Sequence, residues 1–317
     1  MTTLEKLRDS MFPDIYNSFF REDDPSSSRE DWKNIFNYMW KREEDSTGYV
    51  LVDQSDIVGV LGMIFSKRII DDKEYKFCNL HNWQVKEKYR GRSLLLMKPV
   101  LNLKDYTVTD FTPTGRVCTI SKKLGFKELD STLRIFFPKY LSNNISRSNE
   151  FQIITDEETI KAALNNEHLR IFCDHQSYGC AHMLVRSKAN QNDYCYIVYT
   201  SVSRYIRPYC YIHYLSNTYL FERAYKLICS RLSRLNNCSF TVVDNRLLSN
   251  KRFPLSFKFP FQNRQLFLST SVQAKNIDTL YSEVVFLKLC TFPDLSKMIS
   301  RWFQNVGFKT GQGSFFK

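Results

Sequence analysis

The stretch Trp83-Gln84-Val85-Lys86-Glu87-Lys88-Tyr89-Arg90-Gly91-Arg92-Ser93 decides how this chain of 317 residues is interpreted. An apolar strand pattern ends at Val85, a basic turn follows, and residues 93–101 form an apolar run that predicts a buried helix. Backbone N–H groups at the start of a helix bind anions, and Arg90 and Arg92 add positive charge at the same place. The stretch therefore predicts a site for a pyrophosphate.

The sequence on either side of this stretch predicts an α+β domain with one mixed sheet. Helical spacing of apolar residues predicts two opening helices, one over 4–21 and one from Ser28 onward. Alternating apolar residues then predict an antiparallel meander of three strands, at 49–52, 57–65 and 75–85. Beyond the stretch, the pattern predicts a strand at 106–111, a short helix at 116–124 and closing strands within 126–137. We expect these elements to form a first domain over residues 1–145.

Two segments of this domain resemble motifs of the GNAT superfamily of acyl-CoA N-acyltransferases. Residues 83–93 resemble motif A, in which a strand ends at a Val and a Tyr-Arg-Gly turn opens a helix, and residues 114–126 resemble motif B, which closes with Leu-Gly-Phe. The resemblance implies that the strand ending at Val85 is splayed from its neighbour and pairs its main chain with the pantetheine arm of acetyl-CoA or another acyl-CoA. The cofactor-binding residues that it implies are Trp83, Gln84, Val85, Arg90, Gly91, Arg92 and Ser93.

The sequence departs from the family pattern at several of these positions. The two small residues that follow the Arg of motif A are replaced by Ser93 and Leu95. The Tyr that often protonates the leaving CoA thiolate falls at Ser121, and the usual Asn falls at Thr114. Ser121 is therefore the residue at the position of the acid, and the standard acid is missing.

Candidates for the general base lie on the strand before the turn and after the next strand. Alternation places Asn79, His81, Trp83 and Val85 on one face, and the resemblance implies a base on this strand. His81 is the first choice, because a near-neutral pKa suits the deprotonation of an ammonium nucleophile; the alternative is a half-buried hydrogen-bonding residue. Asp110 and Cys118 are secondary candidates. Asp110 could equally be a turn or capping residue, and Cys118 a small apolar residue on a helix face.

The second half of the sequence repeats the first in a degenerate form. With Gly179 placed on Gly59, residues 168–188 predict a hairpin like that of 49–65, and 194–202 would occupy the place of 75–85. The pattern next predicts a helix at 218–235 and strands at 240–243 and 264–270, and residues 302–308 echo 122–126. We expect a second GNAT-like domain over residues 146–317. Because it has no Arg-Gly-x-Gly turn, only the first domain should bind acyl-CoA.

Positive charge is concentrated in this second half. The whole chain carries a net charge of +12, and residues 151–317 hold 21 Lys and Arg against 11 Asp and Glu. Such a field favours an anionic partner. The cluster at 204–211 mixes cations with aromatic rings, so Arg204, Arg207 and Tyr209 are the candidate acceptor-binding residues. A solvated basic face with Tyr in strands is the alternative.

The sequence also gives expectations about metals, disulfides and location. Cys173, His175, Cys180 and His182 suggest zinc, but structural zinc sites more often use Cys-x2-Cys knuckles, so we expect no metal. Nine cysteines in a chain of this size indicate reduced thiols. No run approaches the ~18 apolar residues of a membrane span, and residues 1–10 are too charged for a signal peptide, so we expect a cytoplasmic protein without a membrane partner.

These observations lead to one function hypothesis and two rivals. The leading hypothesis is an acyl-CoA-dependent N-acyltransferase that moves an acetyl or other short acyl group to an amine of a small, anionic acceptor such as a nucleotide-linked amino sugar. One rival is a catalytically silent GNAT-like binding module, supported by Ser93, Leu95 and Ser121. The other is a nucleic-acid-binding protein, although the basic residues form no recognised nucleic-acid motif.

Overall fold

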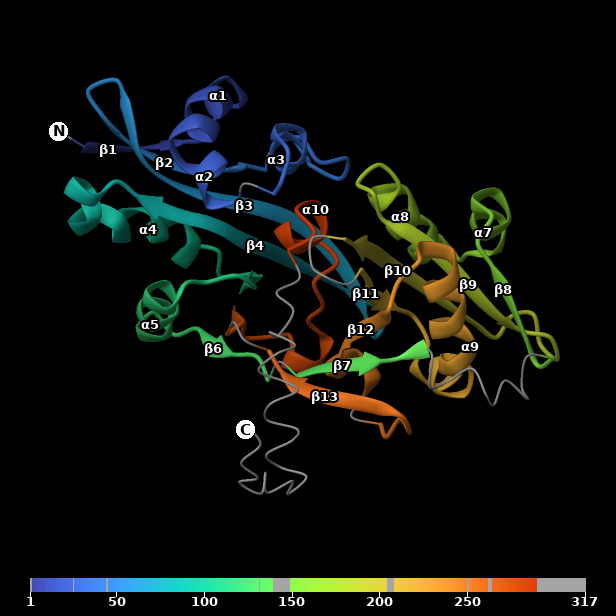
Figure 1. Cartoon of the computed structure of the whole chain (residues 1–317). Coiled ribbons are helices and arrows are strands. Elements are labelled where there is room, and N and C mark those ends of the chain that lie inside the picture. Colours follow the sequence, from blue (N-terminus) through green and yellow to red (C-terminus); the bar gives the residue numbers. More distant parts are fainter. Residues whose placement is uncertain are drawn as a thin grey trace, which may run out of the picture.

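The computed structural model contains two mixed sheets of seven strands, each flanked by helices (Figure 1). It describes residues 2–24, 26–43, 45–130, 132–138, 149–203, 208–249, 251–261 and 264–289. The predicted α+β architecture with two sheets is confirmed. No helix within these described ranges is long and apolar enough to cross a membrane.

The first sheet is built mainly from the first half of the chain. Its spatial order is β1 (Thr2–Lys6), β2 (Gly48–Asp53), β3 (Asp56–Ile70), β4 (Lys73–Val85), β5 (Tyr106–Asp110), β14 (Leu266–Leu268) and β6 (Lys127–Glu128). The pairs are antiparallel except β4 with β5, which run parallel. The predicted meander of three strands corresponds to β2, β3 and β4.

The second sheet has the same plan. Its spatial order is β8 (Phe151–Ile154), β9 (Ala181–Ser187), β10 (Tyr194–Val202), β11 (Tyr209–Leu215), β12 (Phe240–Asp244), β7 (Thr132–Phe136) and β13 (Ser256–Pro260). The pair β11 and β12 is again the parallel one. Because β4 with β5 and β11 with β12 are the parallel pairs of their sheets, β11 is the counterpart of β4.

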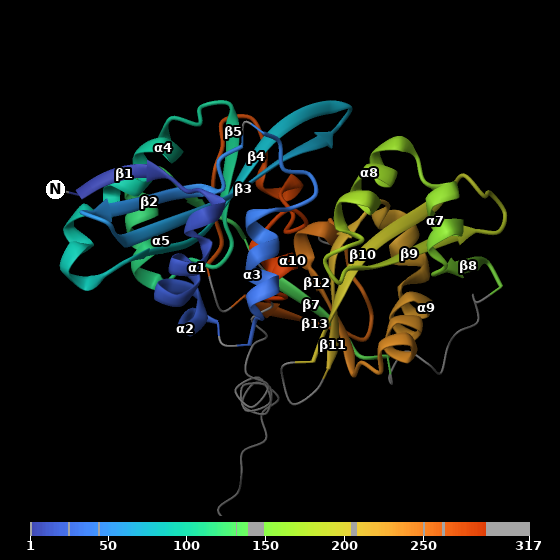
Figure 2. The same cartoon turned by 90° about the horizontal axis from the view of Figure 1, so that it is seen from above.

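Helices cover the two sheets (Figure 2). Those of the first half are α1 (Phe12–Ile15), α2 (Arg21–Asp23), α3 (Arg29–Phe36), the 3₁₀ helix η3 (Glu87–Leu96), α4 (Met97–Leu101) and α5 (Gly115–Lys123). Those of the second half are α7 (Glu157–Ala163), α8 (Asn166–His175), α9 (Thr218–Asn236) and α10 (Glu283–Phe286). The predicted start at Ser28 is confirmed, because Ser28 and Asp31 form a capping box on α3.

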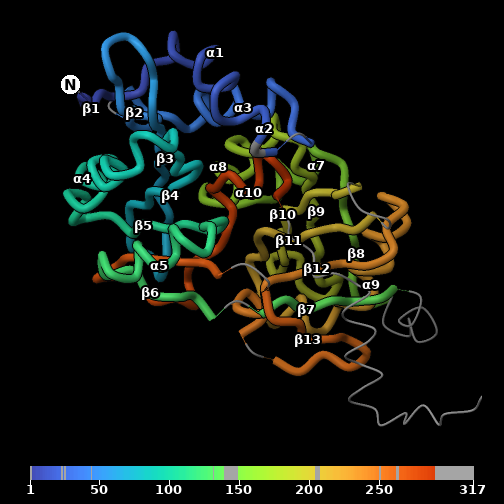
Figure 3. The backbone as a smooth tube through the Cα atoms, turned by 60° about the vertical axis from the view of Figure 1, so that its left-hand side comes forward, coloured from blue at the N-terminus to red at the C-terminus, as the bar shows by residue number. Residues whose placement is uncertain are grey.

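Each sheet contains one strand from the other half of the sequence. In the first sheet, β14 lies between β5 and β6; in the second, β7 lies between β12 and β13. Figure 3 shows the green β7 beside β12 and β13. The division between the sheets therefore does not follow the division of the sequence at residue 145.

Three expectations about local structure are wrong. Thr2–Lys6 forms an edge strand because it pairs with β2, so the helix predicted over 4–21 begins only at Asp9, from which consecutive 3₁₀, α and π turns run to Asp23. The hairpin predicted over 168–188 is helix α8 followed by β9, and the Asn165 side chain caps the helix by accepting from the His168 N–H at 2.8 Å. The repeat was predicted one strand out of register, because β11 rather than β10 is the counterpart of β4.

The segment that carries β14 also links the two sheets. Arg68 on β3 forms a buried ion pair with Asp278 at 2.6 Å. An apolar cluster joins Phe77 and Phe267, near the first sheet, to Tyr211 and Val242 of the second. Residues 266–286 therefore belong structurally to the first sheet as much as to the second.

Candidate active site

The site begins where β4 separates from β5. Their parallel pairing ends at Leu80 and Asp110, whereas β4 continues to Val85. Along that continuation β4 pairs only with β3, through Gln84 with Val60 and Val85 with Gly59. Within the described residues, the other edge of β4 therefore has no strand partner, as the resemblance implied.

A β-bulge lies at the start of this open edge. The register of β3 and β4 shifts between the pairs Gly62 with His81 and Val60 with Gln84. Asn82, at the bulge, has a φ of 50°, in the left-handed region. A bulge turns the strand and redirects its backbone groups. It thus contributes to the divergence of β4 from β5.

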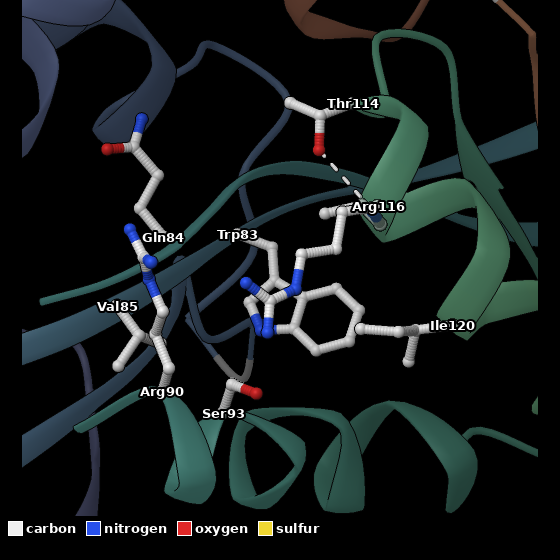
Figure 4. Close-up of a pocket in the computed structure, with 9 residues that line it drawn as sticks. Trp83, Gln84, Val85, Arg90, Ser93, Thr114, Arg116 and Ile120 are labelled. Carbon is white, nitrogen blue, oxygen red and sulfur yellow. Dashed lines mark hydrogen bonds between the residues drawn. The ribbon is translucent and has the colours of Figure 1, made fainter. Parts of the chain in front are cut away.

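A cavity of about 350 Å³ occupies the gap between the open edge of β4 and the start of α5 (Figure 4). Nine residues of β4, η3, α5 and the residue before α5 line it: Trp83, Gln84, Val85, Arg90, Ser93, Thr114, Arg116, Val117 and Ile120. Thr114 caps α5 by accepting a hydrogen bond from the Val117 N–H at 3.4 Å. Two helical N-termini and two arginines thus surround this cavity, which is the arrangement that anionic ligands favour.

Five of the seven predicted cofactor residues line this cavity, and two do not. Gly91 and Arg92 are exposed and lie outside the lining. Arg116, which sequence reasoning missed, takes a place in it instead. The sequence could have indicated Arg116 by its position, because it lies in the first turn of a helix that follows a strand. A cation there is close to the backbone N–H groups that bind an anion.

A second cavity of about 190 Å³ adjoins the first, and four residues line both: Trp83, Gln84, Thr114 and Val117. It is also lined by Asp24, Trp32, His81, Asp110 and Glu283. His81 and Asp110 are two of the predicted catalytic residues. Glu283 is the first residue of α10 and was not predicted.

Asp110 and Glu283 form a pair of buried carboxyl groups. Their exposed fractions are 7% and 1%. Burial raises the pKa of Asp110 to about 7; burial and, after it, the charge of Asp110 raise the pKa of Glu283 to about 8. Thr112 contacts both, since its N–H hydrogen-bonds to Asp110 and its hydroxyl donates to Glu283 Oε1 at 2.8 Å. A carboxyl pair with such pKa values can exchange protons near neutral pH.

His81 lies on β4 against the backbone of β3. Its Nδ1 lies 3.0 Å from Asn82 Oδ1, and burial lowers its pKa to about 4, so the ring is neutral at pH 7. A Cβ added to Gly62 would stand 2.0 Å from the ring, and only glycine leaves room for the imidazole there. This low pKa makes His81 a weaker base than the carboxyl pair.

The other predicted catalytic candidates lie on the core side of α5. Ser121 is 2% exposed and Cys118 packs in an apolar cluster below the first sheet. Neither residue lines either cavity.

Of the three predicted acceptor-binding residues, one is in the core and two are outside the described part of the chain. Tyr209 is fully buried and stacks on Phe240 with the ring centroids 5.2 Å apart, so it has no surface to offer an acceptor. Arg204 and Arg207 lie outside the described residues.

The four Cys and His side chains that suggested zinc do not come together. Both ring nitrogens of His175 are occupied by the carbonyl oxygens of Ile171 and Leu280, at 2.9 and 2.8 Å. Cys173 is exposed, whereas His182 is buried beside Tyr196. In the described part of the chain, no three His, Cys, Asp or Glu side chains are grouped to hold a metal ion.

Comparisons with known proteins identify the fold. No protein-family model matches the sequence, and no curated protein matches it. Among solved structures, the GCN5-related N-acetyltransferase from Kribbella flavida superposes with a TM-score of 0.53 at 14% identity, covering 84% of this chain and 70% of that one. A conserved protein of unknown function from Enterococcus faecalis V583 superposes with a TM-score of 0.56 at 11% identity, covering 86% and 74%.

A third structure is only partly covered. The GCN5-related glucosamine N-acetyltransferase region of a fungal multi-domain GH3 beta-N-acetylglucosaminidase gives a TM-score of 0.51 at 13% identity, over 84% of this chain and 38% of that one. At these identities the likeness concerns the fold. Together with the two sheets and the diverging β4, it shows that this chain has the GNAT fold in a tandem arrangement.

Proposed function

We propose that the protein is an acyl-CoA-dependent N-acyltransferase. The observation that carries the proposal is the junction of two cavities: one along an open strand edge between two helical N-termini, the other lined by buried carboxyl groups. The first suits acyl-CoA, and the second suits an amine that must lose a proton before it can attack a thioester.

The first cavity is suited to acyl-CoA in three ways. The backbone groups of β4 that face the open edge, from Trp83 to Val85, can pair with the amides of the pantetheine arm. Arg90 and Arg116 can neutralise the pyrophosphate. Backbone donors near Val85 would polarise the thioester carbonyl and stabilise the oxyanion that forms. The thioester then lies at the junction of the two cavities, close to Trp83.

In the second cavity, Asp110 is our candidate for the general base. Its pKa of about 7 suits the acceptance of a proton from an ammonium group near neutral pH. Ser121, at the position of the family's Tyr, lines neither cavity, so in this proposal a proton reaches the CoA sulfur from the attacking nitrogen or from water.

An amino sugar is the acceptor class that we test first. The charge excess of residues 151–317 favours an anionic form, such as a nucleotide-linked amino sugar. The name of the fungal structure above, a glucosamine N-acetyltransferase region, adds a reason to include the free amino sugar.

The test is calorimetry with acetyl-CoA at moderate salt, together with a free-thiol assay against amines and nucleotide-linked amino sugars. Binding with amine-dependent thiol release is the expected result. Binding of acetyl-CoA without thiol release from any amine would favour the silent binding module.

No binding of acetyl-CoA would contradict the proposal. Steeply salt-dependent binding of random duplex or single-stranded nucleic acid would then favour the hypothesis of a nucleic-acid-binding protein.

A further inference from the structure

Three residues that line the second cavity, which we call the acceptor cavity, each carry a buried polar atom that lacks a hydrogen-bond partner among the described residues. The atoms are Trp32 Nε1, His81 Nε2 and Glu283 Oε2. The three residues are 1%, 3% and 1% exposed, and all line the cavity of about 190 Å³. Buried polar groups are nearly always paired, and three exceptions around one cavity indicate the place of a ligand.

Two of these atoms are hydrogen-bond acceptors, which points to a cation, while the Trp32 indole N–H is a donor that an acceptor atom of the same ligand, such as a hydroxyl oxygen, can satisfy. Asn82 Oδ1 accepts from His81 Nδ1, so in the neutral ring Nε2 is a hydrogen-bond acceptor. Glu283 Oε2 is a second acceptor, while Oε1 is already bonded to the Thr112 hydroxyl. A primary ammonium carries three N–H donors and can satisfy both acceptors at once.

The charges around the cavity are of one sign. Asp24, Asp110 and Glu283 line it, and no Lys or Arg does so within the described chain. Its volume is below the ~300–1,000 Å³ of pockets for drug-sized ligands, so only the amine-bearing end of an acceptor fits. An anionic group close to the amine would meet the carboxyl groups of Asp110 and Glu283, whereas Arg90 and Arg116 line the other cavity.

Glu283 is held in this position by both neighbouring strands of the first sheet. Its backbone N–H donates to Asn79 Oδ1 at 3.2 Å, and the Asn79 amide donates to Thr109 Oγ1 at 3.2 Å. A residue from near the end of the described chain is thus fixed against β4 and the end of β5. Such fixing on rigid elements is what a catalytic side chain requires.

We propose that this cavity is an ammonium site in which Glu283 binds and deprotonates the acceptor, and that the acceptor is a compact primary amine with no anionic group near the nitrogen. The inference rests on the proposed N-acyltransferase function and deepens it. It replaces the anionic acceptor with a neutral or cationic one, and it assigns the role of general base to Glu283, from the second half of the sequence, with Asp110 as its acidic neighbour.

The proton and electron balance of the step is simple. The ammonium gives one proton to the Glu283 carboxylate, and the freed nitrogen lone pair forms the bond to the thioester carbonyl carbon. When the C–S bond breaks, its electron pair leaves with the CoA sulfur. The second proton of the nitrogen is transferred to that sulfur, which gives the amide and free CoA thiol. The proton on Glu283 then returns to solvent.

The pH dependence follows from the charges that face Glu283. Asp110 is its close acidic neighbour, Asp24 lies on the same cavity, and His81 is neutral above its pKa of about 4. Burial and the Asp110 charge raise the pKa of Glu283 to about 8, so kcat/KM should rise as the pH increases from 6 to 9. Asp110→Asn removes the like charge beside Glu283. The midpoint of kcat/KM against pH, measured on the activity that this variant retains, should therefore move to lower pH.

The experiment measures thiol release with acetyl-CoA and paired acceptors at equal concentration: a short diamine, ethanolamine and glucosamine against glycine and glucosamine 1-phosphate, whose anionic groups lie close to the amine. We expect kcat/KM to be at least tenfold higher for the first group. Glu283→Gln should lower kcat by about 100-fold or more, because general-base catalysis contributes ~10²–10⁴. Its affinity for acetyl-CoA should not change. Glu128→Gln, an exposed carboxylate paired with Lys122, is the matched control.

Each failure has a distinct meaning. If the wild-type protein does not bind acetyl-CoA, the proposed function is wrong. If it binds acetyl-CoA and releases thiol but prefers the anionic acceptors, or if Glu283→Gln keeps the wild-type rate and pH profile, the ammonium site is wrong and the function stands. If Glu283→Gln fails to fold by circular dichroism, Thr112→Val tests the same point by removing the hydroxyl that positions the carboxylate; an unchanged rate and pH profile would then overturn the proposal.

Discussion

The central strands of the two sheets, β4 and β11, each carry a histidine at a β-bulge, and the two histidines differ in their hydrogen bonds. Both strands pair in parallel with the next strand over four or five residues and then diverge after a bulge, at Asn82 in β4 and at His213 in β11. In the first sheet, His81 Nε2 has no partner in the described chain, and a cavity adjoins it. In the second sheet, both ring nitrogens of His213 are bonded: Nε2 to Thr200 Oγ1 at 2.9 Å and Nδ1 to Thr279 Oγ1 at 3.1 Å.

The comparison shows that the same backbone plan gives a site in one half and a packed core in the other. In the second sheet, Thr279 hydrogen-bonds to His213 at the bulge of β11. Arg68 from β3 lies over the rings of Tyr214 and Tyr281 beside it. After β11 the chain enters α9 directly through its cap Asn217, with no basic turn. A diverging strand therefore does not by itself leave a cavity, because the neighbouring chain segments decide whether its edge stays open.

The largest effect should come from dividing the chain at residue 145. A fragment of residues 1–145 lacks β14, which lies between β5 and β6, and lacks Glu283. We expect no cooperative thermal unfolding and no acetyl-CoA binding, and we expect both to return on co-expression with residues 146–317. An isolated fragment that unfolds cooperatively and binds acetyl-CoA would show that the two halves are independent.

The next largest effect should come from Gly62→Ala, which disturbs the bulge of β4 beside the cavity. The new Cβ would stand 2.0 Å from the His81 ring, so the imidazole must move. We expect a loss of stability of ~1–3 kcal/mol, the usual cost of overpacking, and a fall in kcat that exceeds the change in acetyl-CoA affinity. Denaturant unfolding and the thiol assay measure the two effects. Gly91→Ala, where a Cβ would meet nothing within 4 Å, is the control, and a similar loss in both variants would refute the explanation.

Thr279→Val tests the bulge of β11, where both ring nitrogens of His213 are hydrogen-bonded. The valine keeps the shape but removes the hydroxyl that bonds His213 Nδ1, which leaves a buried ring nitrogen without its partner. We expect a loss of ~1–3 kcal/mol in the free energy of unfolding and an unchanged acetyl-CoA affinity. Thr279→Ser should retain most of the stability. A loss of acetyl-CoA binding in Thr279→Val would mean that the second sheet takes part in that site.

The smallest effects should separate the arginines around the first cavity. Arg90→Ala and Arg116→Ala each remove a cation from the lining, and we expect the Kd for acetyl-CoA to rise about tenfold, which corresponds to ~1.4 kcal/mol. Arg92→Ala, on the same turn but outside the lining, should change it least. Calorimetry at two salt concentrations measures all three. An equal loss in Arg92→Ala would favour a general field effect over contacts in the cavity.

Local signals explain which parts of this structure could be predicted from the sequence. The alternation of 75–85 and the basic turn after Val85 are properties of consecutive residues, and they correctly placed β4 and most of the first cavity. The hairpin predicted over 168–188 failed for a local reason, since the cap at Asn165 starts a helix whose buried side includes Phe172 and His175.

Other features depend on partners far along the chain. The strand character of Thr2–Lys6 comes from β2, about 45 residues away. Nothing in the sequence around Glu283 marks a site residue. Its role arises because β14 inserts into the first sheet and brings the following segment against Asn79, 204 residues away. The exchange of β7 and β14 is a long-range pairing that no periodicity reveals.

The exchanged strand β14 also determines when the site can exist during synthesis. A ribosome makes the chain from the N-terminus, and β14 is translated after all seven described strands of the second sheet. A nascent or prematurely terminated product that stops before residue 266 has the basic turn after β4 but lacks both β14 and Glu283. Only a chain translated past Glu283 can assemble the proposed catalytic centre, so incomplete products should not consume acyl-CoA.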